Sequence, residues 1–202
     1  MIKNVIFDFG CVLVYWSKHN LYDAYFGSRE KTDWFIDNVC TWEWNNQTDI
    51  GKTFAESVDE KIAEFPEWEK EIRMYWEQWE DMIGGAVEGM EEWIRELKEA
   101  GYNVYGLSNW SSETFPLVKN KFPVFGMMDG IVMSGEELIA KPDLRIYQIL
   151  LDRYGLKADE CVFIDDRQSN IDAAQVIGIH GITFKSCEQT KQAFHQIANK
   201  YN

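Results

Sequence analysis

The second half of the chain alternates between short apolar runs and amphipathic stretches, and this alternation is the strongest constraint on its fold. The apolar runs predict β-strands at residues 103–107, 130–133, 161–164 and 181–184, and the amphipathic stretches predict helices. Parallel strands joined by helices require right-handed crossovers, which place helices on both faces of the sheet. We therefore predict an α/β fold with a Rossmann-like parallel sheet and helices on both faces.

The first half of the chain has a different texture after one opening strand. Residues 5–7 are apolar and strand-like, Asp8 stands where this strand ends, and Gly10 follows where the backbone turns. Residues 14–86 are crowded with aromatic and acidic side chains, and their apolar residues recur at helical spacing. We predict a helical cap of residues 14–86, inserted after the first strand into a core made of residues 1–13 and 87–202.

Charge, cysteine content and hydropathy limit the partners and the compartment of the chain. The formal net charge of −14 disfavours binding to nucleic acids and to anionic membrane surfaces. No uncharged apolar run approaches the roughly 20 residues that span a bilayer. The four cysteines are far apart and form no CxxC pair, which is typical of reduced thiols and not of a zinc site. We expect a cytoplasmic protein that is a monomer or a weak homodimer, with no nucleic-acid or membrane partner.

Polar side chains stand where the predicted strands end. Asp8 and Ser108 each follow a strand, and the pair Asp165 and Asp166 follows another. Lys141 lies in a loop that leads into a helix. Each of these residues alone has an ordinary explanation as a turn or capping residue. The strands of an open parallel sheet end at one edge, however, and ligands bind there, so we expect these side chains to form one site.

The residue types at this edge favour phosphoryl transfer. Carboxylates that lie together repel one another unless a hard cation joins them, and Mg²⁺ is the usual choice. A lysine and a hydroxyl beside that cation complete a site for a phosphate group. Asp8 can then act as a nucleophile that forms an aspartyl phosphate, which water hydrolyses in a second step. Lys141 and Mg²⁺ would stabilise the charge on the transferred group.

Four short motifs resemble the signature motifs of the haloacid dehalogenase (HAD) superfamily. They are FDFGCVL, LSN, KPD and FIDD, and they occur in the order found in that superfamily. The resemblance covers the predicted core, and residues 14–86 resemble the cap that many members insert after the first motif. It implies a hydrolase in which Asp8 is the nucleophile. Ser108 and Lys141 would be catalytic and, together with Asn109, would bind the phosphate. Mg²⁺ would be held by Asp8, the Gly10 carbonyl, Asp165 and Asp166, and Asn170 would be a weaker supporting residue.

Gly10 departs from the pattern of most phosphatases in this superfamily. They carry at this position an aspartate that serves as general acid and base. A subgroup with the pattern FDxGxV, similar to the α-D-glucose-1-phosphate phosphatases, hydrolyses sugar phosphates nonetheless. We predict a Mg²⁺-dependent phosphatase of a small phosphorylated metabolite, a sugar phosphate, with a preference for good leaving groups. Tyr15 and His19 are candidates for the missing acid, Trp16 is a further contact from the cap, and a water molecule is the leading alternative.

Two alternative functions stay open. A metal-independent haloacid dehalogenase would use Asp8 to displace halide from carbon, although Asp165 and Asp166 would repel the carboxylate of its substrate. A binding or regulatory protein with this fold would have lost turnover, and Gly10 is the feature in its favour. Chloride release without Mg²⁺ would indicate the first alternative, and a lack of turnover on every phosphoester would indicate the second.

Overall fold

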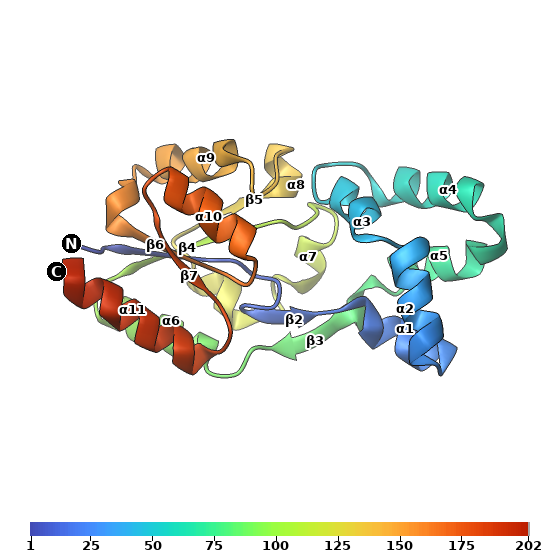
Figure 1. The fold of residues 1–202 in the computed structure, drawn as a ribbon, viewed down its shortest axis with the longest axis horizontal. Coiled ribbons are helices and arrows are strands. Elements are labelled where there is room, and N and C mark those ends of the chain that lie inside the picture. The colour runs from blue at the N-terminus through green and yellow to red at the C-terminus, as the bar shows by residue number, and fades with distance from the viewer. Residues whose placement is uncertain (202) are drawn as a thin grey trace.

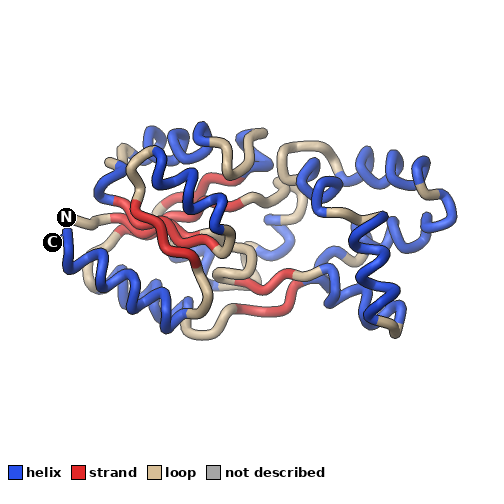
Figure 2. The backbone as a smooth tube through the Cα atoms, viewed as in Figure 1, coloured by secondary structure: helices blue, strands red, loops and turns tan. Residues whose placement is uncertain are grey.

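The computed structural model describes residues 1–201, and its larger part is built on a five-stranded parallel sheet (Figures 1 and 2). The strand order is β5-β4-β1-β6-β7, so the first strand lies at the centre of the sheet. This arrangement confirms the predicted α/β fold. The strands are β1 (Asn4–Phe7), β4 (Asn103–Ser108), β5 (Gly130–Met133), β6 (Cys161–Asp165) and β7 (His180–Thr183).

Helices cover both faces of this sheet, as Figure 1 shows. α6 (Met90–Glu99) and α11 (Cys187–Tyr201) lie on one face, and α9 (Leu144–Tyr154) and α10 (Gln168–Val176) lie on the other. Within residues 1–201, no helix is both long and apolar enough to cross a membrane. Shorter helical elements complete the core: α7 (Phe115–Val118), α8 (Ser134–Glu137), η3 (Pro123–Met127) and η4 (Ala158–Glu160).

The central strand shows how the sequence produces two apolar layers. Successive side chains of a strand point to opposite faces, so Phe7 belongs to one buried cluster and Ile6 to the other. The ring of Phe7 meets Trp93 of α6 edge-on, with the ring centroids 5.5 Å apart. Trp93 in turn packs against Phe194 of α11, at 5.8 Å between centroids. Because both faces of β1 are buried, Val5, Ile6 and Phe7 are all apolar, without the alternation of a half-exposed strand.

The strand order determines where Asp8 lies. β1 pairs with β4 on one side and with β6 on the other, so the chain changes from one half of the sheet to the other beside β1. The backbone N–H of Asp8 donates to the Ile164 carbonyl at 2.9 Å, which extends the pairing by one residue. Asp8 therefore stands at the carboxyl end of the central strand. In open α/β sheets the ligand-binding crevice lies at this point.

The cap joins the core through a two-stranded ribbon, which Figure 1 shows between the two parts. β2 (Val14–Trp16) pairs antiparallel with β3 (Ile83–Ala86). The predicted helical segment of residues 14–86 thus begins and ends in strands, which corrects the prediction. A strand of three or four residues is too short for its alternation to be recognised. The cap helices are α1 (Lys18–Phe26), α2 (Arg29–Asn38), α3 (Trp42–Thr48), α4 (Phe54–Glu64) and α5 (Glu69–Glu77), with short turns η1 (Pro66–Trp68) and η2 (Trp79–Met82).

Residues with a hydroxyl side chain are the N-caps of four of the cap helices. Ser17, Ser28, Thr41 and Thr53 each accept a hydrogen bond from a backbone N–H in the first turn of the helix that follows. Thr53 and Glu56 form the reciprocal pair of bonds known as a capping box. These caps satisfy N–H groups that the helices themselves leave unpaired, so short helices are stable in this part of the chain.

The aromatic residues of the cap form a core of its own. Phe35 is fully buried, and the ring centroids of Tyr22, Phe26 and Trp68 lie 4.9, 5.4 and 5.2 Å from its ring. Aromatic rings bury large apolar areas, and pairs in tilted or edge-on geometry add a further attraction. This packing accounts for Trp68 without a ligand.

The turn between α3 and α4 rests on the core. The backbone N–H of Phe54, at the start of α4, donates to Glu113 Oε2 at 2.7 Å. Gly51 has φ +98°, and a Cβ at this position would lie 2.2 Å from the Leu138 side chain. The positive φ therefore favours glycine at this position. These contacts hold the α3–α4 turn beside the loops that follow β4 and β5.

Candidate active site

Asp8 is the centre of a cluster of polar side chains at the carboxyl end of β1. Its Oδ1 accepts hydrogen bonds from Ser108 Oγ at 2.8 Å and from the Phe9 backbone N–H at 2.7 Å, and it lies 2.9 Å from Lys141 Nζ. In the described part of the chain no donor lies on Oδ2. Oδ2 is therefore the oxygen that can turn to a substrate or a metal.

Lys141 is held by three acceptors that satisfy its three N–H groups. Besides Asp8, its Nζ donates to the Leu107 carbonyl and to Asp165 Oδ2, each at 2.7 Å. Its side chain is 1% exposed. Burial opposes the ammonium form, but the attraction of Asp165 and Asp8 outweighs burial and raises the pKa of Lys141. Lys141 therefore carries a fixed positive charge beside Asp8.

Asn109 holds the backbone of Lys141. Its Oδ1 accepts from the Lys141 N–H at 2.8 Å, and its Nδ2 donates to the Lys141 carbonyl at 2.9 Å. The predicted contact of Asn109 with phosphate stays a prediction, but this pair of bonds gives the residue a positioning role that its place in the LSN motif did not indicate. It links the loop after β4 to the loop before α9.

Asp165 and Asp166 are adjacent in sequence and differ in environment. Asp165 is fully buried, and its two oxygens accept from the Arg167 N–H at 2.8 Å and from Asn170 Nδ2 at 2.9 and 3.0 Å, in addition to Lys141. Asp166 is exposed and lines the cavity above Asp8. Asp165 is thus engaged in holding Lys141, whereas Asp166 is available to a ligand.

Three carboxylates fit a divalent cation at this site. One oxygen from each of Asp8, Asp165 and Asp166 lies within 4.8 Å of the others. Burial raises the pKa of Asp8 to about 6, Lys141 opposes this rise, and the other two carboxylates add to it. Lys141 pairs with Asp8 and Asp165, and a hard cation such as Mg²⁺ suits the remaining negative charge and the oxygen donors. The Gly10 backbone lines the same cavity.

A cavity of about 680 Å³ extends from these residues into the cap. Aromatic side chains from both parts of the molecule line it, including Trp16, Trp42, Trp79 and Trp110. Trp16 packs against Trp42 with ring centroids 5.5 Å apart. The Trp16 Nε1 atom is buried and has no hydrogen-bond partner within residues 1–201. The cavity therefore offers aromatic faces next to the polar cluster.

The predicted cap residues do not all reach this cavity. Trp16 and His19 line it, whereas Tyr15 is 50% exposed and is absent from its walls among the described residues. His19 Nδ1 lies 3.1 Å from Asp23 Oδ1, and its Nε2 lies 3.3 Å from an Arg29 nitrogen. Both ring nitrogens of His19 are thus engaged within the cap.

Four charged residues of the cavity, Lys18, Glu43, Asp49 and Arg167, were not predicted. Lys18, at the start of α1, is buried, and Asp49, at the end of α3, is half-buried. In the sequence, Lys18 reads as a residue after a helix cap and Asp49 as a residue of a turn before Gly51. Their approach to Asp8 depends on how the cap helices pack on the core, for which no motif in the sequence gives a signal.

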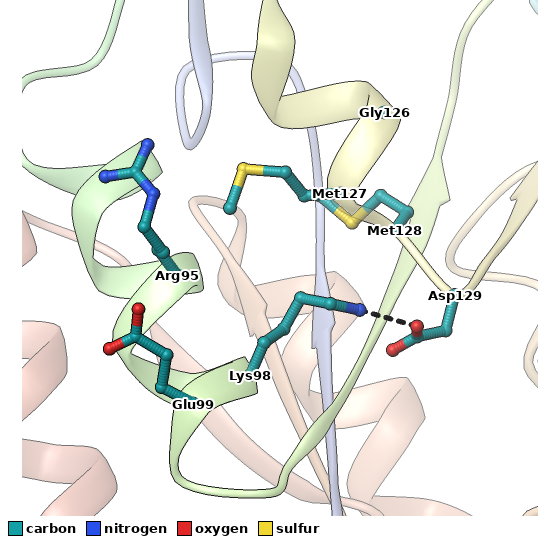
Figure 3. A pocket seen from close by; sticks show the side chains of 7 residues that line it. All are labelled: Arg95, Lys98, Glu99, Gly126, Met127, Met128 and Asp129. Carbon is teal, nitrogen blue, oxygen red and sulfur yellow. Dashed lines mark hydrogen bonds and ion pairs between the residues drawn. The ribbon is translucent and has the colours of Figure 1, made fainter.

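A second cavity, of about 480 Å³, lies away from this cluster between α6 and the segment of residues 126–129 (Figure 3). Lys98 and Asp129 pair with each other there at 2.5 Å. Arg95 and Glu99 come from the same helix as Lys98, and two methionines complete the wall. None of the predicted site residues lines it, so we place the candidate active site at Asp8.

Comparison with known proteins was consistent with this geometry. A family model described as haloacid dehalogenase-like hydrolase matches residues 2–178. The sesquiterpene phosphatase astK of Aspergillus oryzae is 32% identical over 107 residues, which are 51% of this chain and 55% of that protein. The (S)-2-haloacid dehalogenase 4A of Burkholderia cepacia is 30% identical over 91 residues, 45% of this chain and 39% of that protein.

A solved structure covers nearly the whole chain. It is a HAD family enzyme of Bacteroides thetaiotaomicron in complex with magnesium and inorganic phosphate, 25% identical, with a TM-score of 0.69 over 93% of this chain and 96% of that chain. By contrast, this chain aligns with only 39% to 55% of the length of the two curated relatives. Because the match to the solved structure covers 93% of this chain, that likeness extends through both the core and the cap.

Proposed function

The chain belongs to the haloacid dehalogenase-like hydrolase family, and on that premise we propose that it is a Mg²⁺-dependent phosphatase of a small phosphorylated metabolite. The observation that carries the proposal is the convergence of Ser108 Oγ and Lys141 Nζ on one oxygen of Asp8, at 2.8 and 2.9 Å, beside the carboxylate of Asp166. A nucleophile, a hydroxyl donor, a fixed cation and a metal-binding carboxylate are the parts that phosphoryl transfer requires.

The reaction follows from these positions. Asp8 Oδ2 attacks phosphorus and displaces the leaving oxygen, which produces an aspartyl phosphate. Ser108 and Lys141 lie where they can hold phosphoryl oxygens and balance their charge. Asp8 and Asp166, with the Gly10 carbonyl, would hold Mg²⁺, which supplies further charge stabilisation when bound. Water then attacks phosphorus, releases inorganic phosphate and regenerates Asp8.

The electrostatics of the site favour phosphoryl transfer over dehalogenation. Both a phosphatase and a dehalogenase are among the relatives of the chain, so family membership does not choose between them. In the site itself, Lys141 is already paired with Asp8 and Asp165, and Asp166 adds a further negative charge. A haloacid carboxylate would meet repulsion here, whereas a phosphate can share the cation that the carboxylates bind.

We propose a sugar phosphate as the substrate class. The cavity has indole faces, and the faces of indole rings suit the apolar faces of sugar rings. Asn45 and Asn46 add polar groups to the same wall.

The test is an assay of phosphate release over a panel of sugar phosphates and p-nitrophenyl phosphate, with Mg²⁺ and with a chelator. We expect turnover that requires Mg²⁺ and is abolished in Asp8→Asn. Asp59→Asn is the matched control, because Asp59 is an exposed aspartate of α4 away from the cavity. A lack of turnover on every phosphoester would contradict the proposal and favour a binding or regulatory protein. Release of halide from a 2-haloacid without Mg²⁺ would favour a dehalogenase.

A further inference from the structure

The reaction needs a proton donor that the first motif does not supply. Gly10 has no side chain at the position where most phosphatases of the superfamily carry the acid. In phosphoryl transfer the attacking and leaving oxygens lie roughly in line with phosphorus. The leaving oxygen therefore points away from Asp8, toward the part of the cavity that the cap encloses. A donor for this oxygen has to come from the cap or from water.

Four titratable residues of the cap line the cavity, and three of them are unsuited to give a proton. Burial lowers the pKa of Lys18 to about 8, but its Nζ donates to the Cys40 carbonyl and lies 4.8 Å from the centroid of Trp42, so its ammonium group is engaged within the cap. His19 is engaged at both ring nitrogens, by Asp23 and Arg29. Glu43 is the third unsuited residue. Hydrogen bonds from its own backbone N–H and from the Thr41 hydroxyl lower the pKa of the Glu43 carboxyl group, so Glu43 is ionised at neutral pH.

The fourth residue, Asp49, is fixed in place at the end of α3. Asn45 Nδ2 donates to Asp49 Oδ2 at 3.1 Å, and the Ser111 backbone N–H is a second donor. Ser111 belongs to the loop that follows Ser108, so Asp49 lies close to the loop of the catalytic hydroxyl. The contact of Gly51 with Leu138, two residues further on, holds the same turn against the core.

The electrostatic surroundings of Asp49 keep a proton available. Burial raises the pKa of Asp49 to about 7, Lys18 and the Ser111 N–H oppose the rise, and Asp8 adds to it. Lys18 and Asp8 are the charged groups that act on Asp49 most strongly. Protonated and ionised forms are therefore both populated near neutral pH. A residue with this property can give a proton in one step and take one in the next.

We propose that Asp49, a cap residue in the wall of the cavity that also contains Asp8, is the general acid and base of the phosphatase reaction. The proposal rests on the proposed function. In the first step Asp8 forms a bond to phosphorus, the bond to the leaving oxygen breaks, and that oxygen takes the proton of Asp49. In the second step a water oxygen attacks phosphorus and gives a proton to Asp49, and the bond to Asp8 breaks. The products are an alcohol and inorganic phosphate, and both aspartates return to their starting forms.

The substitution Asp49→Asn tests this role on two substrates that differ in their need for an acid. An alkyl phosphate such as glucose 6-phosphate has a poor leaving group, so we expect its turnover to fall roughly 10²- to 10³-fold. Nitrophenolate leaves without a proton, so its release from p-nitrophenyl phosphate in the first turnover should change less than about tenfold. Because water attack lacks its base, the variant should show a burst of nitrophenolate followed by slow steady turnover.

Two further variants separate chemistry from structure. Asp49→Ser keeps an oxygen acceptor and has no titratable group, so it should reproduce the pattern of Asp49→Asn. Gly10→Asp restores the aspartate of the first motif, and its Cβ has no heavy atom within 4 Å. In the double variant Gly10→Asp with Asp49→Asn we expect recovery of alkyl phosphate turnover. Asp59→Asn is again the matched control, and thermal unfolding checks that every variant is folded.

The outcomes distinguish the two proposals. If the wild-type protein hydrolyses both phosphates and Asp49→Asn hydrolyses both at the wild-type rate, the role of Asp49 is contradicted and the phosphatase proposal stands. Equal losses on both substrates, with no burst and no recovery in the double variant, would indicate a structural role and also contradict the inference. If the wild-type protein hydrolyses no phosphoester of the panel, both proposals fail.

Discussion

Lys141 Nζ lies 2.7 Å from Asp165 Oδ2, and both side chains of this ion pair are buried, at 1% and 0% exposure. Asp165 is in turn held by Asn170 and the Arg167 N–H, while Asn109 holds the backbone of Lys141. Most polar groups of the site therefore serve to fix one ammonium group beside Asp8. Such fixed charge is effective because it needs no reorganisation when the charge of the reacting group changes.

The first prediction concerns the buried charge of Lys141. The substitution Lys141→Met leaves Asp8 and Asp165 without their cation, so we expect the free energy of unfolding to fall by roughly 3–5 kcal/mol. Lys98→Met is the matched control, because Lys98 pairs with Asp129 at 2.5 Å on the surface, with 34% and 37% exposure. Its effect should stay within about 1 kcal/mol. Urea unfolding without Mg²⁺ measures both, and equal losses would contradict the interpretation.

The second prediction separates the two adjacent aspartates. Asp165 uses its oxygens to accept from Lys141, Asn170 and Arg167, so Asp165→Asn places an amide N–H against these donors. We expect a loss of roughly 2–4 kcal/mol in the free energy of unfolding. Asp166→Asn should change this free energy by less than about 1 kcal/mol because Asp166 is exposed.

Mg²⁺ binding should weaken in Asp166→Asn, although the free energy of unfolding of this variant changes little. In Asp166→Asn we expect a Mg²⁺ dissociation constant roughly tenfold higher or more, since the variant loses a charged ligand. Calorimetric titration with MgCl₂ measures it, and urea unfolding of the same samples gives the stability. An unchanged dissociation constant in Asp166→Asn would remove Asp166 from the proposed ligand set.

The sequence was sufficient to locate the core of the site, and the reason is topological. Asp8, Ser108 and Asp165 each end a strand, and neighbouring parallel strands end at the same edge of a sheet. Asp49 and Lys18 follow no such rule. Helical periodicity indicates which face of a helix is buried, but the packing of the cap on the core decides which residues approach Asp8.

The third prediction concerns close packing behind the site. A Cβ on Gly106 of β4 would lie 2.3 Å from Phe9 Cζ. The Phe9 ring has no room to move, because Phe125 and Phe115 pack on it at 4.8 and 5.7 Å between centroids. We expect Gly106→Ala to lower the free energy of unfolding by roughly 1–3 kcal/mol.

Gly10→Ala is the matched comparison for this substitution. No heavy atom lies within 4 Å of a Cβ at Gly10, so its change in unfolding free energy should be below about 0.5 kcal/mol. Urea unfolding of the two variants under the same conditions provides the measurement. A larger loss in Gly10→Ala than in Gly106→Ala would contradict the packing described for the first motif.

The fourth prediction concerns the pH dependence that Lys18 gives to stability. Burial lowers the pKa of Lys18 from 10.5 to about 8. Between these two pH values the unfolded chain binds more protons at this residue than the folded chain, so the free energy of unfolding rises with pH. From pH 7.5 to 9.5 we expect Lys18 to contribute an increase of about 2 kcal/mol.

This contribution is isolated by comparing the wild-type protein with Lys18→Met. The variant has no titratable group at this position, so the stability of the wild-type protein relative to it should improve as the pH is raised from 7.5 to 9.5. Lys119→Met is the control, because Lys119 is exposed on the core and its removal should leave the pH dependence unchanged. Urea unfolding at the two pH values gives the slopes. If the free energy of unfolding changed equally with pH in the wild-type protein and in Lys18→Met, Lys18 would keep its proton in the folded protein. Its ammonium group would then be a permanent positive charge in the wall of the cavity.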